Sequence, residues 1–272
     1  VNRPAKFPPG TAPIWSPTPA DVARANVTAF IGAVRARHPA APVSDLDSLY
    51  RWSLAAPELF WAEVWRFGGV IAEERPGRDP WDAVAIGLDR MAPPDPVTGP
   101  AWFPGARLNF AENLLRYRDD RPALIAWDES GPRSRWSFAE LAAEVARIAA
   151  ALRKAGVGPG DRVAGFLPNI PEAVIAMLAT TSLGAVWSSC SPDGGAKGVL
   201  DRFGQIEPVV LFTVDGYRYA GKEIDCRDRI REVVSQLPGL TTVIGIPVLR
   251  PDPDWSGVPR VSTWEAFART GA

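Results

Sequence analysis

The chain has few of the residues on which metal and redox chemistry depend. One histidine, His38, and two cysteines, Cys190 and Cys226, occur among its 272 residues. No Cys-x-x-Cys, His-Glu-x-x-His or Gly-x-Ser-x-Gly run is present, although zinc sites and hydrolase triads rely on such groups. We therefore predict no metal site in these residues and interpret His38 as structural. Two cysteines make no disulfide framework, which favours a cytoplasmic location.

A dominant charge and long apolar runs are lacking too. Thirty Lys and Arg against 31 Asp and Glu give a formal net charge of −1, which argues against nucleic acid or an anionic membrane as the partner. No apolar run approaches the roughly 20 residues of a membrane span. The N-terminal residues contain no apolar signal-peptide region. With 46% hydrophobic residues, the chain has enough apolar material for a core.

Residues 1–105 predict a helical N-terminal extension. After a proline-rich start, Thr18 and Asp21 form an N-cap pair for a helix that runs to about Arg37. A second helix is expected after a Ser44 and Asp47 pair. The inward-facing residues expected in the first helix are Val22, Phe30 and Val34.

Pro57 is expected to open a third helix, Pro-Glu-Leu-Phe-Trp-Ala-Glu-Val-Trp-Arg-Phe. Its aromatic residues are too many for one stripe, so we expect burial on two sides. The other tryptophans of this half suit either a platform for a sugar or aromatic ligand or the packing of a small helical cap onto the rest of the chain. We favour packing, because tryptophan is usually buried. Residues 73–106 are expected to be irregular, with a short strand near 83–88.

Residues 106–272 predict an α/β fold, a parallel sheet flanked by helices. Ser137 and Glu140 form a capping box for a helix that Gly156 ends. An apolar residue recurs every three or four positions in this helix, and the short apolar run 163–167 then suits a buried parallel strand. The strand and helix patterns alternate further along the chain, which indicates parallel pairing. The other expected strands are 122–127, 133–138, 185–190, 209–214 and 241–246, and the other expected helices begin near residues 109, 171, 196, 225 and 263.

Three loops are candidates for phosphate binding. The run from Gly156 to Gly160 follows a helix and precedes a strand, the wrong order for a dinucleotide loop, so we predict a plain turn. Asp193-Gly-Gly195, with Lys197, has the right order but not the Gly-x-x-x-x-Gly-Lys-Ser/Thr spacing, and a turn is again favoured. The run from Tyr217 to Lys222 contains an arginine and a lysine after a strand end, and phosphate contact and a solvated basic loop both remain open.

Three long runs resemble the acetoacetyl-CoA synthetase branch of the acyl-adenylate-forming (AMP-binding) enzymes, to which acetyl-CoA synthetases are related. They are Trp102 to Leu115, Ser137 to Asp193 and Gly198 to Asp225. The earlier run Ser48 to Phe67 resembles the N-terminal extension of both branches. The resemblance implies the first part of an adenylate-forming domain from residue 106, preceded by an acetyl-CoA-synthetase-type extension.

The resemblance also implies an activity. Such ligases convert acetoacetate, ATP and CoA to acetoacetyl-CoA, AMP and diphosphate through an acyl-adenylate, with Mg²⁺, in lipid and ketone-body metabolism. The family's ATP loop, which ends in Pro-Lys, its adenosine-binding segment and the lysine of its C-terminal domain do not occur in these residues. We therefore expect an N-terminal fragment that has no catalytic residue, needs the remainder of its own polypeptide and is inactive alone.

The resemblance also implies a contact with CoA in residues 218–222. The acetyl-CoA branch carries an Arg-Gly-Gly-Arg loop that binds the phosphates of CoA, and the similar position here is one residue longer. The implied CoA-binding residues are Arg218, Tyr219, Gly221 and Lys222. The alternatives are an acetate or propionate ligase and a noncatalytic α/β module that binds CoA or a protein.

Overall fold

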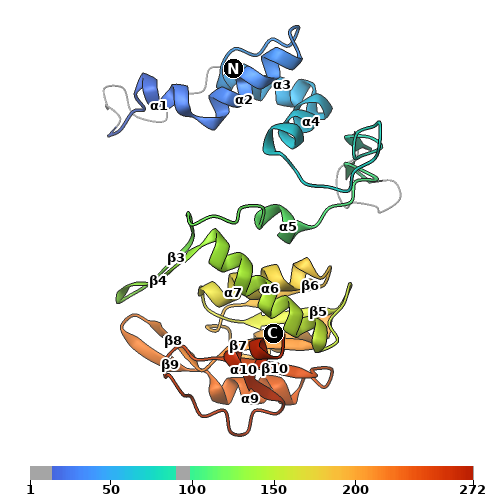
Figure 1. Ribbon diagram of the computed structural model, residues 1–272. Coiled ribbons are helices and arrows are strands. Elements are labelled where there is room, and N and C mark those ends of the chain that lie inside the picture. Colours follow the sequence, from blue (N-terminus) through green and yellow to red (C-terminus); the bar gives the residue numbers. More distant parts are fainter. Residues whose placement is uncertain (1–13, 90–98, 272) are drawn as a thin grey trace. The chain divides into compact units, whose positions relative to one another are not determined.

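A computed structural model of the chain describes residues 14–89 and 99–271. The chain divides into two compact units, Val1–Arg107 and Leu108–Ala272, and Figure 1 shows the elements of each. The predicted helical extension and the predicted α/β fold are both present. The expected proline-rich segment 1–13 lies outside the described residues.

Helices dominate the first unit. α1 (Pro19–Arg24), α2 (Asn26–Arg37), α3 (Leu46–Ala55) and α4 (Pro57–Gly68) follow one another along the chain. Their buried apolar core consists of Phe30, Val34, Val43, Leu49 and Trp52.

Three details of these helices differ from the sequence prediction. The predicted long helix is broken at Ala25, whose ψ of 137° is extended, and Val22 is 48% exposed rather than inward-facing. The cap of α3 is Asp45, whose carboxylate accepts the Ser48 N–H at 2.8 Å, so the predicted Ser44 and Asp47 pair was wrong. The Thr18 and Asp21 pair is confirmed, because each accepts from the other's backbone N–H.

The aromatic residues of this unit pack mainly on one another. Trp65 lies 5.0 Å from Trp81 and 4.6 Å from Phe103 between ring centroids. Trp61 is 41% exposed and Phe67 is 45% exposed, so within this unit α4 is not buried on two sides as predicted. Trp52 and Trp81 are buried inside the unit, and the packing of the tryptophans onto the rest of the chain stays a prediction.

The rest of the first unit is largely irregular. β1 (Ala85–Ile86) lies in the stretch where a short strand was predicted, and it pairs antiparallel with β2 (Ala101–Trp102). Residues 90–98, part of the stretch predicted to be irregular, lie outside the described residues.

A five-stranded sheet forms the centre of the second unit (Figure 1). The strand order is β11-β10-β7-β5-β6, and every neighbouring pair is parallel. The strands are β5 (Arg162–Phe166), β6 (Val186–Cys190), β7 (Val210–Val214), β10 (Thr242–Ile246) and β11 (Val261–Thr263).

Helices cover both faces of this sheet. α6 (Phe138–Lys154), α7 (Pro171–Ser182) and α10 (Trp264–Arg269) share one apolar core with it. α8 (Ala196–Ile206) and α9 (Arg227–Ser235) share a second core on the other face. The short helix α5 (Phe110–Leu114) is capped by Asn109, whose carboxamide oxygen accepts the Glu112 N–H at 3.1 Å.

The predicted start and end of α6 are confirmed in detail. The Ser137 N–H donates to the Glu140 carboxylate at 2.7 Å, and the Glu140 N–H donates to the Ser137 hydroxyl at 3.2 Å. Gly156 follows the helix with φ of +90°, a backbone conformation that glycine adopts without steric cost. The helix thereby ends where β5 can begin as a buried strand.

Two antiparallel hairpins stand apart from the five-stranded sheet. β3 (Pro122–Asp128) and β4 (Gly131–Ser137) form the first, at the predicted place. β8 (Gly216–Tyr219) and β9 (Lys222–Asp225) form the second. This second hairpin and β11 were missed, and the run from 217 to 222, expected as a loop after a strand end, contains the adjoining ends of β8 and β9 and the turn between them.

Candidate functional site

The order of the strands defines one crevice at the carboxyl edge of the parallel sheet. β5 continues into α7 on one face, whereas β7 leads through the second hairpin to α9 on the other face. β5 and β7 are neighbours in the sheet. Where adjacent strands send their connections to opposite faces, a crevice opens beyond the strand ends, and ligands of α/β proteins bind there.

A pocket of about 370 Å³ occupies this position. Its walls are the segments that follow β5, β7 and β10, together with the tip of the β3–β4 hairpin. Both charges are present, since Arg133 and Arg218 face a pocket that Asp128, Glu129 and Glu172 also line. The crevice expected from strand order is therefore a real concavity that carries ionisable groups.

Of the four residues expected to bind CoA, the structure brings one into this pocket. Arg218 lines it and pairs with Glu223 at 2.7 Å across the β8–β9 hairpin. Tyr219 is 67% exposed, and Lys222 lies opposite it in the hairpin register. No ion pair of Lys222 is found among residues 14–89 and 99–271. The Gly221 N–H donates to a carboxylate oxygen of Glu129 at 2.7 Å.

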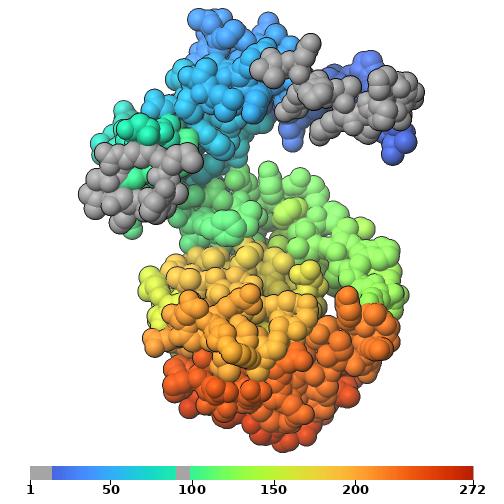
Figure 2. Space-filling view, turned by 180° about the vertical axis from the view of Figure 1, so that it is seen from behind, coloured from blue at the N-terminus to red at the C-terminus, as the bar shows by residue number. Residues whose placement is uncertain are grey.

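Both hairpin tips meet beside the pocket. The turn of the β3–β4 hairpin supplies Glu129, which also accepts the Ala220 N–H at 2.6 Å. Figure 1 draws both hairpins on the same side of the second unit, and in Figure 2 the lime-green and orange surfaces that they form adjoin. Glu129 was not singled out from the sequence, because its partners lie 91 and 92 residues further along the chain.

A buried carboxylate fixes the segment that follows β10. Asp215 is fully buried and comes directly after β7. It accepts the Val248 N–H at 2.7 Å, the Leu249 N–H at 3.1 Å and the Arg250 N–H at 3.0 Å. Backbone donors satisfy this buried charge, as a buried polar group requires. Val248, a pocket residue, is thereby held in place.

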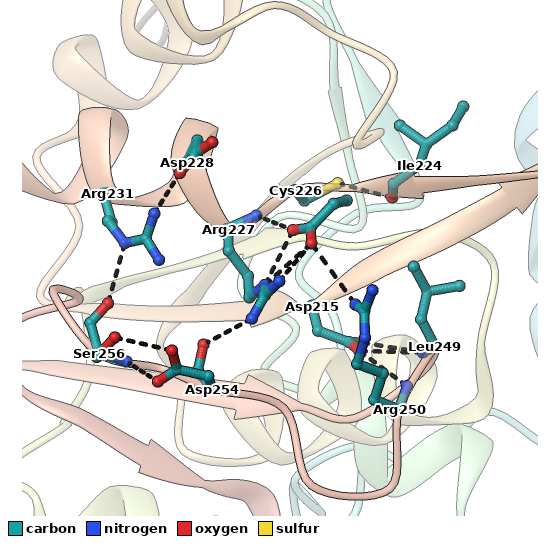
Figure 3. A network of polar contacts seen from close by, with 11 residues as sticks. Asp215, Ile224, Cys226, Arg227, Asp228, Arg231, Leu249, Arg250, Asp254 and Ser256 are labelled. Atoms are coloured by element: carbon teal, nitrogen blue, oxygen red, sulfur yellow. Dashed lines mark hydrogen bonds and ion pairs between the residues drawn. The ribbon is translucent and has the colours of Figure 1, made fainter.

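An ion-pair network continues from this segment toward α9 (Figure 3). The Asp225 carboxylate lies 2.6 Å from the Arg227 guanidinium and 3.5 Å from that of Arg250. The hydrogen bond from Arg227 is the main reason that the pKa of Asp225 falls to about 2. Arg227 also donates to the Asp254 carbonyl oxygen at 3.2 Å. The network joins the base of the β8–β9 hairpin to the loop after β10.

Glu172 is a pocket residue whose pKa is raised. It lies in the first turn of α7, which Pro171 opens. Burial raises its pKa above the ordinary value, with a smaller contribution from the nearby negative charge of Glu144, while a backbone N–H partly opposes the shift. Perturbed carboxyl groups in clefts mark candidate functional residues. The Pro-Glu pair that follows a strand was the available sequence signal, and it was used only to place the helix.

The other sequence candidates have structural explanations. His38 follows α2, and its Nε2 lies 3.3 Å from the Glu63 carboxylate. The loop at Asp193 is a turn between β6 and α8, and Lys197 pairs with Asp201 at 2.8 Å. Gly156 to Gly160 is the predicted plain turn between a helix and a strand.

Two kinds of feature are absent from the described residues. Over residues 14–89 and 99–271, no cluster of three or more His, Cys, Asp or Glu side chains has a geometry that suits a metal ion. In the same part of the chain, each helix is too short or too polar to traverse a lipid bilayer. Both cysteines are buried free thiols.

Comparisons with known proteins identify the family and the fold. The "AMP-binding enzyme" family profile matches residues 110–262, and the "Acetyl-coenzyme A synthetase N-terminus" profile matches residues 46–114. An acetoacetyl-CoA synthetase of Macaca fascicularis is 43% identical over 233 residues, which are 84% of this chain and 33% of the relative. For an acetoacetyl-coenzyme A synthetase of Rhizobium meliloti the identity is 40%, over 85% of this chain and 34% of the relative.

A solved structure of an acetoacetyl-CoA synthetase is similar to this chain as well. The acetoacetyl-CoA synthetase from Streptomyces lividans superposes with a TM-score of 0.81 at 44% identity, over 95% of this chain and 38% of that one. The chain thus spans about a third of the length of the curated relatives that it matches.

Proposed function

This chain belongs to the AMP-binding enzyme family, and from that premise we propose that its protein is an ATP-dependent acid–thiol ligase that makes acetoacetyl-CoA. The reaction consumes acetoacetate, ATP and CoA and yields acetoacetyl-CoA, AMP and diphosphate. The likeness to acetoacetyl-CoA synthetases over most of the chain is the observation that supports it. Because the chain spans about a third of those relatives, the proposal concerns the reaction of the whole protein.

The proposed chemistry has two steps. An acetoacetate oxygen attacks the α-phosphorus of ATP, the bond to the β-phosphate oxygen breaks, and diphosphate leaves with its electron pair. The CoA thiol, losing its proton, then attacks the acyl carbon and expels AMP. Mg²⁺, when bound, would neutralise phosphate charge in the first step. We propose no ATP or Mg²⁺ contact for residues 1–272.

The part assigned to this chain is a contact with CoA. The crevice between β5 and β7 has a pocket with Arg218 in its wall, and Lys222 is exposed three positions beyond the β8 end. A guanidinium binds phosphate through two parallel N–H donors, and an ammonium adds a mobile point charge. Tyr219 and the Gly221 N–H complete the proposed contact at the hairpin tip.

Acetate or propionate is the second candidate for the acid. The match of residues 46–114 to an acetyl-CoA synthetase profile favours it. The two candidates differ in the acid but share the adenylate and CoA steps, so one assay separates them.

A substrate panel tests the proposal. The full-length protein is incubated with ATP, Mg²⁺, CoA and one acid at a time, and AMP and thioester are measured. We expect the kcat/KM for acetoacetate to exceed that for acetate and propionate at least tenfold. A preference for acetate would replace the acid in the proposal, and the absence of AMP with every acid would refute a ligase.

Arg218→Ala and Lys222→Ala test the CoA contact. Each variant removes one charge-assisted bond to phosphate, and such a bond contributes about 1.5 kcal/mol, or roughly a tenfold change in KM for CoA. The rate of adenylate formation, measured by diphosphate release without CoA, should not change. Arg153→Ala and Lys154→Ala are matched controls, because they remove exposed charges at the end of α6 that precedes β5. An unchanged KM in both hairpin variants would remove this assignment.

A cytoplasmic location is also proposed. Both cysteines are buried free thiols, which suits a reducing compartment.

A further inference from the structure

The Glu129 carboxylate occupies a pair of backbone donors that would otherwise be open to a ligand. Its two oxygens accept the Ala220 N–H at 2.6 Å and the Gly221 N–H at 2.7 Å. Glu129, Ala220 and Gly221 are all exposed. A solvent-accessible carboxylate therefore lies on two converging amide groups at the tip of the β8–β9 hairpin.

The backbone of this tip is shaped to hold an anion. Ala220 has φ of +50° and Gly221 has φ of +72°, so two successive residues adopt the left-handed conformation, as in a two-residue type I′ hairpin turn. Alanine adopts this conformation only at a steric cost. Successive N–H groups that point the same way form a concavity that binds anions. The Glu129 carboxylate, which accepts both N–H groups, is an anion of the kind that such a concavity binds.

Charged side chains also lie close to the tip of the β8–β9 hairpin. Arg218, two residues before Ala220, lines the pocket together with Glu129 and pairs with Glu223. Beside Glu129 in the chain, Asp128 pairs with Arg133 at 3.0 Å. Each carboxylate here has a partner within the chain. An incoming anion consequently finds the Ala220 and Gly221 N–H groups and the guanidinium groups of Arg133 and Arg218 already paired.

We propose that Glu129 is an intramolecular competitor for the hairpin-tip amides, and that a phosphate group of CoA displaces it. The inference deepens the proposed function and depends on CoA being the ligand. Phosphate carries up to two negative charges and three acceptor oxygens, whereas a carboxylate carries one charge and two oxygens. Phosphate therefore replaces Glu129, while a monocarboxylate such as acetoacetate gains nothing by the exchange. Glu129 lowers the affinity for every anion but keeps the acid substrate off the CoA contact.

Three variants separate the effect of Glu129 occupying the two amides from the effect of its negative charge. Glu129→Gln keeps the length of the side chain and loses the charge. Glu129→Asp keeps the charge but withdraws it by one methylene from the two amides. Glu232→Gln is the control, because it removes one negative charge from an exposed residue of α9. The full-length proteins are titrated with CoA and with inorganic diphosphate by calorimetry, and hydrogen exchange of residues 216–225 is followed by mass spectrometry.

We expect Kd for CoA and for diphosphate to fall about threefold to tenfold in Glu129→Gln, and less in Glu129→Asp. Glu232→Gln should match the wild type. The peptide spanning 216–225 should exchange faster in both Glu129 variants without ligand and regain protection when CoA binds.

The outcomes distinguish this inference from the proposed function. If CoA binds the wild type and both Glu129 variants bind it no more tightly, Glu129 only holds the hairpins together and the inference is overturned. If diphosphate binding tightens in Glu129→Gln but CoA binds none of the proteins, the amides are an anion site and the CoA assignment fails. If Glu129→Gln and Glu232→Gln tighten binding equally, long-range charge is the cause and occupancy is rejected.

Discussion

At the scale of single residues, Glu172 is a carboxyl group whose ionised form the fold disfavours. Burial raises its pKa, so the folded state prefers the protonated carboxyl. Its contribution to stability is complete below the ordinary pKa of the unfolded chain, about 4.3, and is lost as the pH rises through the folded value.

Glu172→Gln should therefore stabilise the protein at pH 7–8 and have no effect near pH 4. We expect Tm at pH 7.5 to rise by about 2–4 °C, which corresponds to about 1 kcal/mol for a protein of this size. Thermal unfolding followed by circular dichroism at several pH values measures the difference. Glu232→Gln, on exposed helix surface, is the matched control, and an equal gain in both variants at both pH values would contradict the explanation by burial.

How well single residues could be predicted depended on how far away their partners lie. Ser137 and Glu140 cap α6 as predicted, because the partners are three residues apart. The pairing of Arg218 with Glu223 and of Glu129 with the hairpin tip depends on a hairpin and on a fold that local patterns do not specify. The assignment of Arg218, Tyr219, Gly221 and Lys222 to CoA stays a prediction.

At the scale of elements, the β8–β9 hairpin depends on a close approach at Gly216. A Cβ atom at Gly216 would lie 2.3 Å from the Ile224 carbonyl oxygen and 2.4 Å from a Leu249 side-chain carbon. The first of these is backbone, so a side chain at this position would displace β9.

Gly216→Ala should lower the free energy of unfolding by about 1–3 kcal/mol, the usual cost of overpacking. Gly198→Ala is the opposite control, because a Cβ there meets nothing within 4 Å and alanine favours helix by up to about 1 kcal/mol. Urea denaturation at pH 7 measures both. A Gly216→Ala protein as stable as the wild type would show that the hairpin yields easily at this point.

The sequence predicted long or strongly patterned elements well and short or polar ones poorly. In α6, the expected apolar residues Leu141, Val145, Ile148 and Leu152 are buried, and β5, β6, β7 and β10 lie within a residue of their predicted places. β8 and β9 were missed because they are polar and their turn is Ala-Gly, whereas Asn-Gly is the usual signal. The break at Ala25 has no glycine or proline to mark it.

At the scale of the whole molecule, the two units contain separate cores. The first is built on Phe30, Val34 and their neighbours, and the second has one core on each face of the sheet. Strand order, which fixed the crevice between β5 and β7, was not deducible from the alternating pattern alone, since many orders share that pattern.

Residues 108–272 should therefore fold without residues 1–107. We expect a polypeptide of residues 108–272 to show the same slow hydrogen exchange in α6, β5 and β7 as the complete chain, because these elements bury their apolar faces within the unit. Mass spectrometry on both polypeptides makes the comparison. Rapid exchange throughout these elements in the shorter polypeptide would show that the first unit is required.

The contact between the hairpin tips joins residues 91 positions apart in the chain. Closing so large a loop costs entropy that a pair of exposed hydrogen bonds does not repay. The tips can meet only once the sheet has brought their bases together. Glu129 thus reaches its amides late in folding, and the first loosening of the native state should part these two tips while the sheet stays whole.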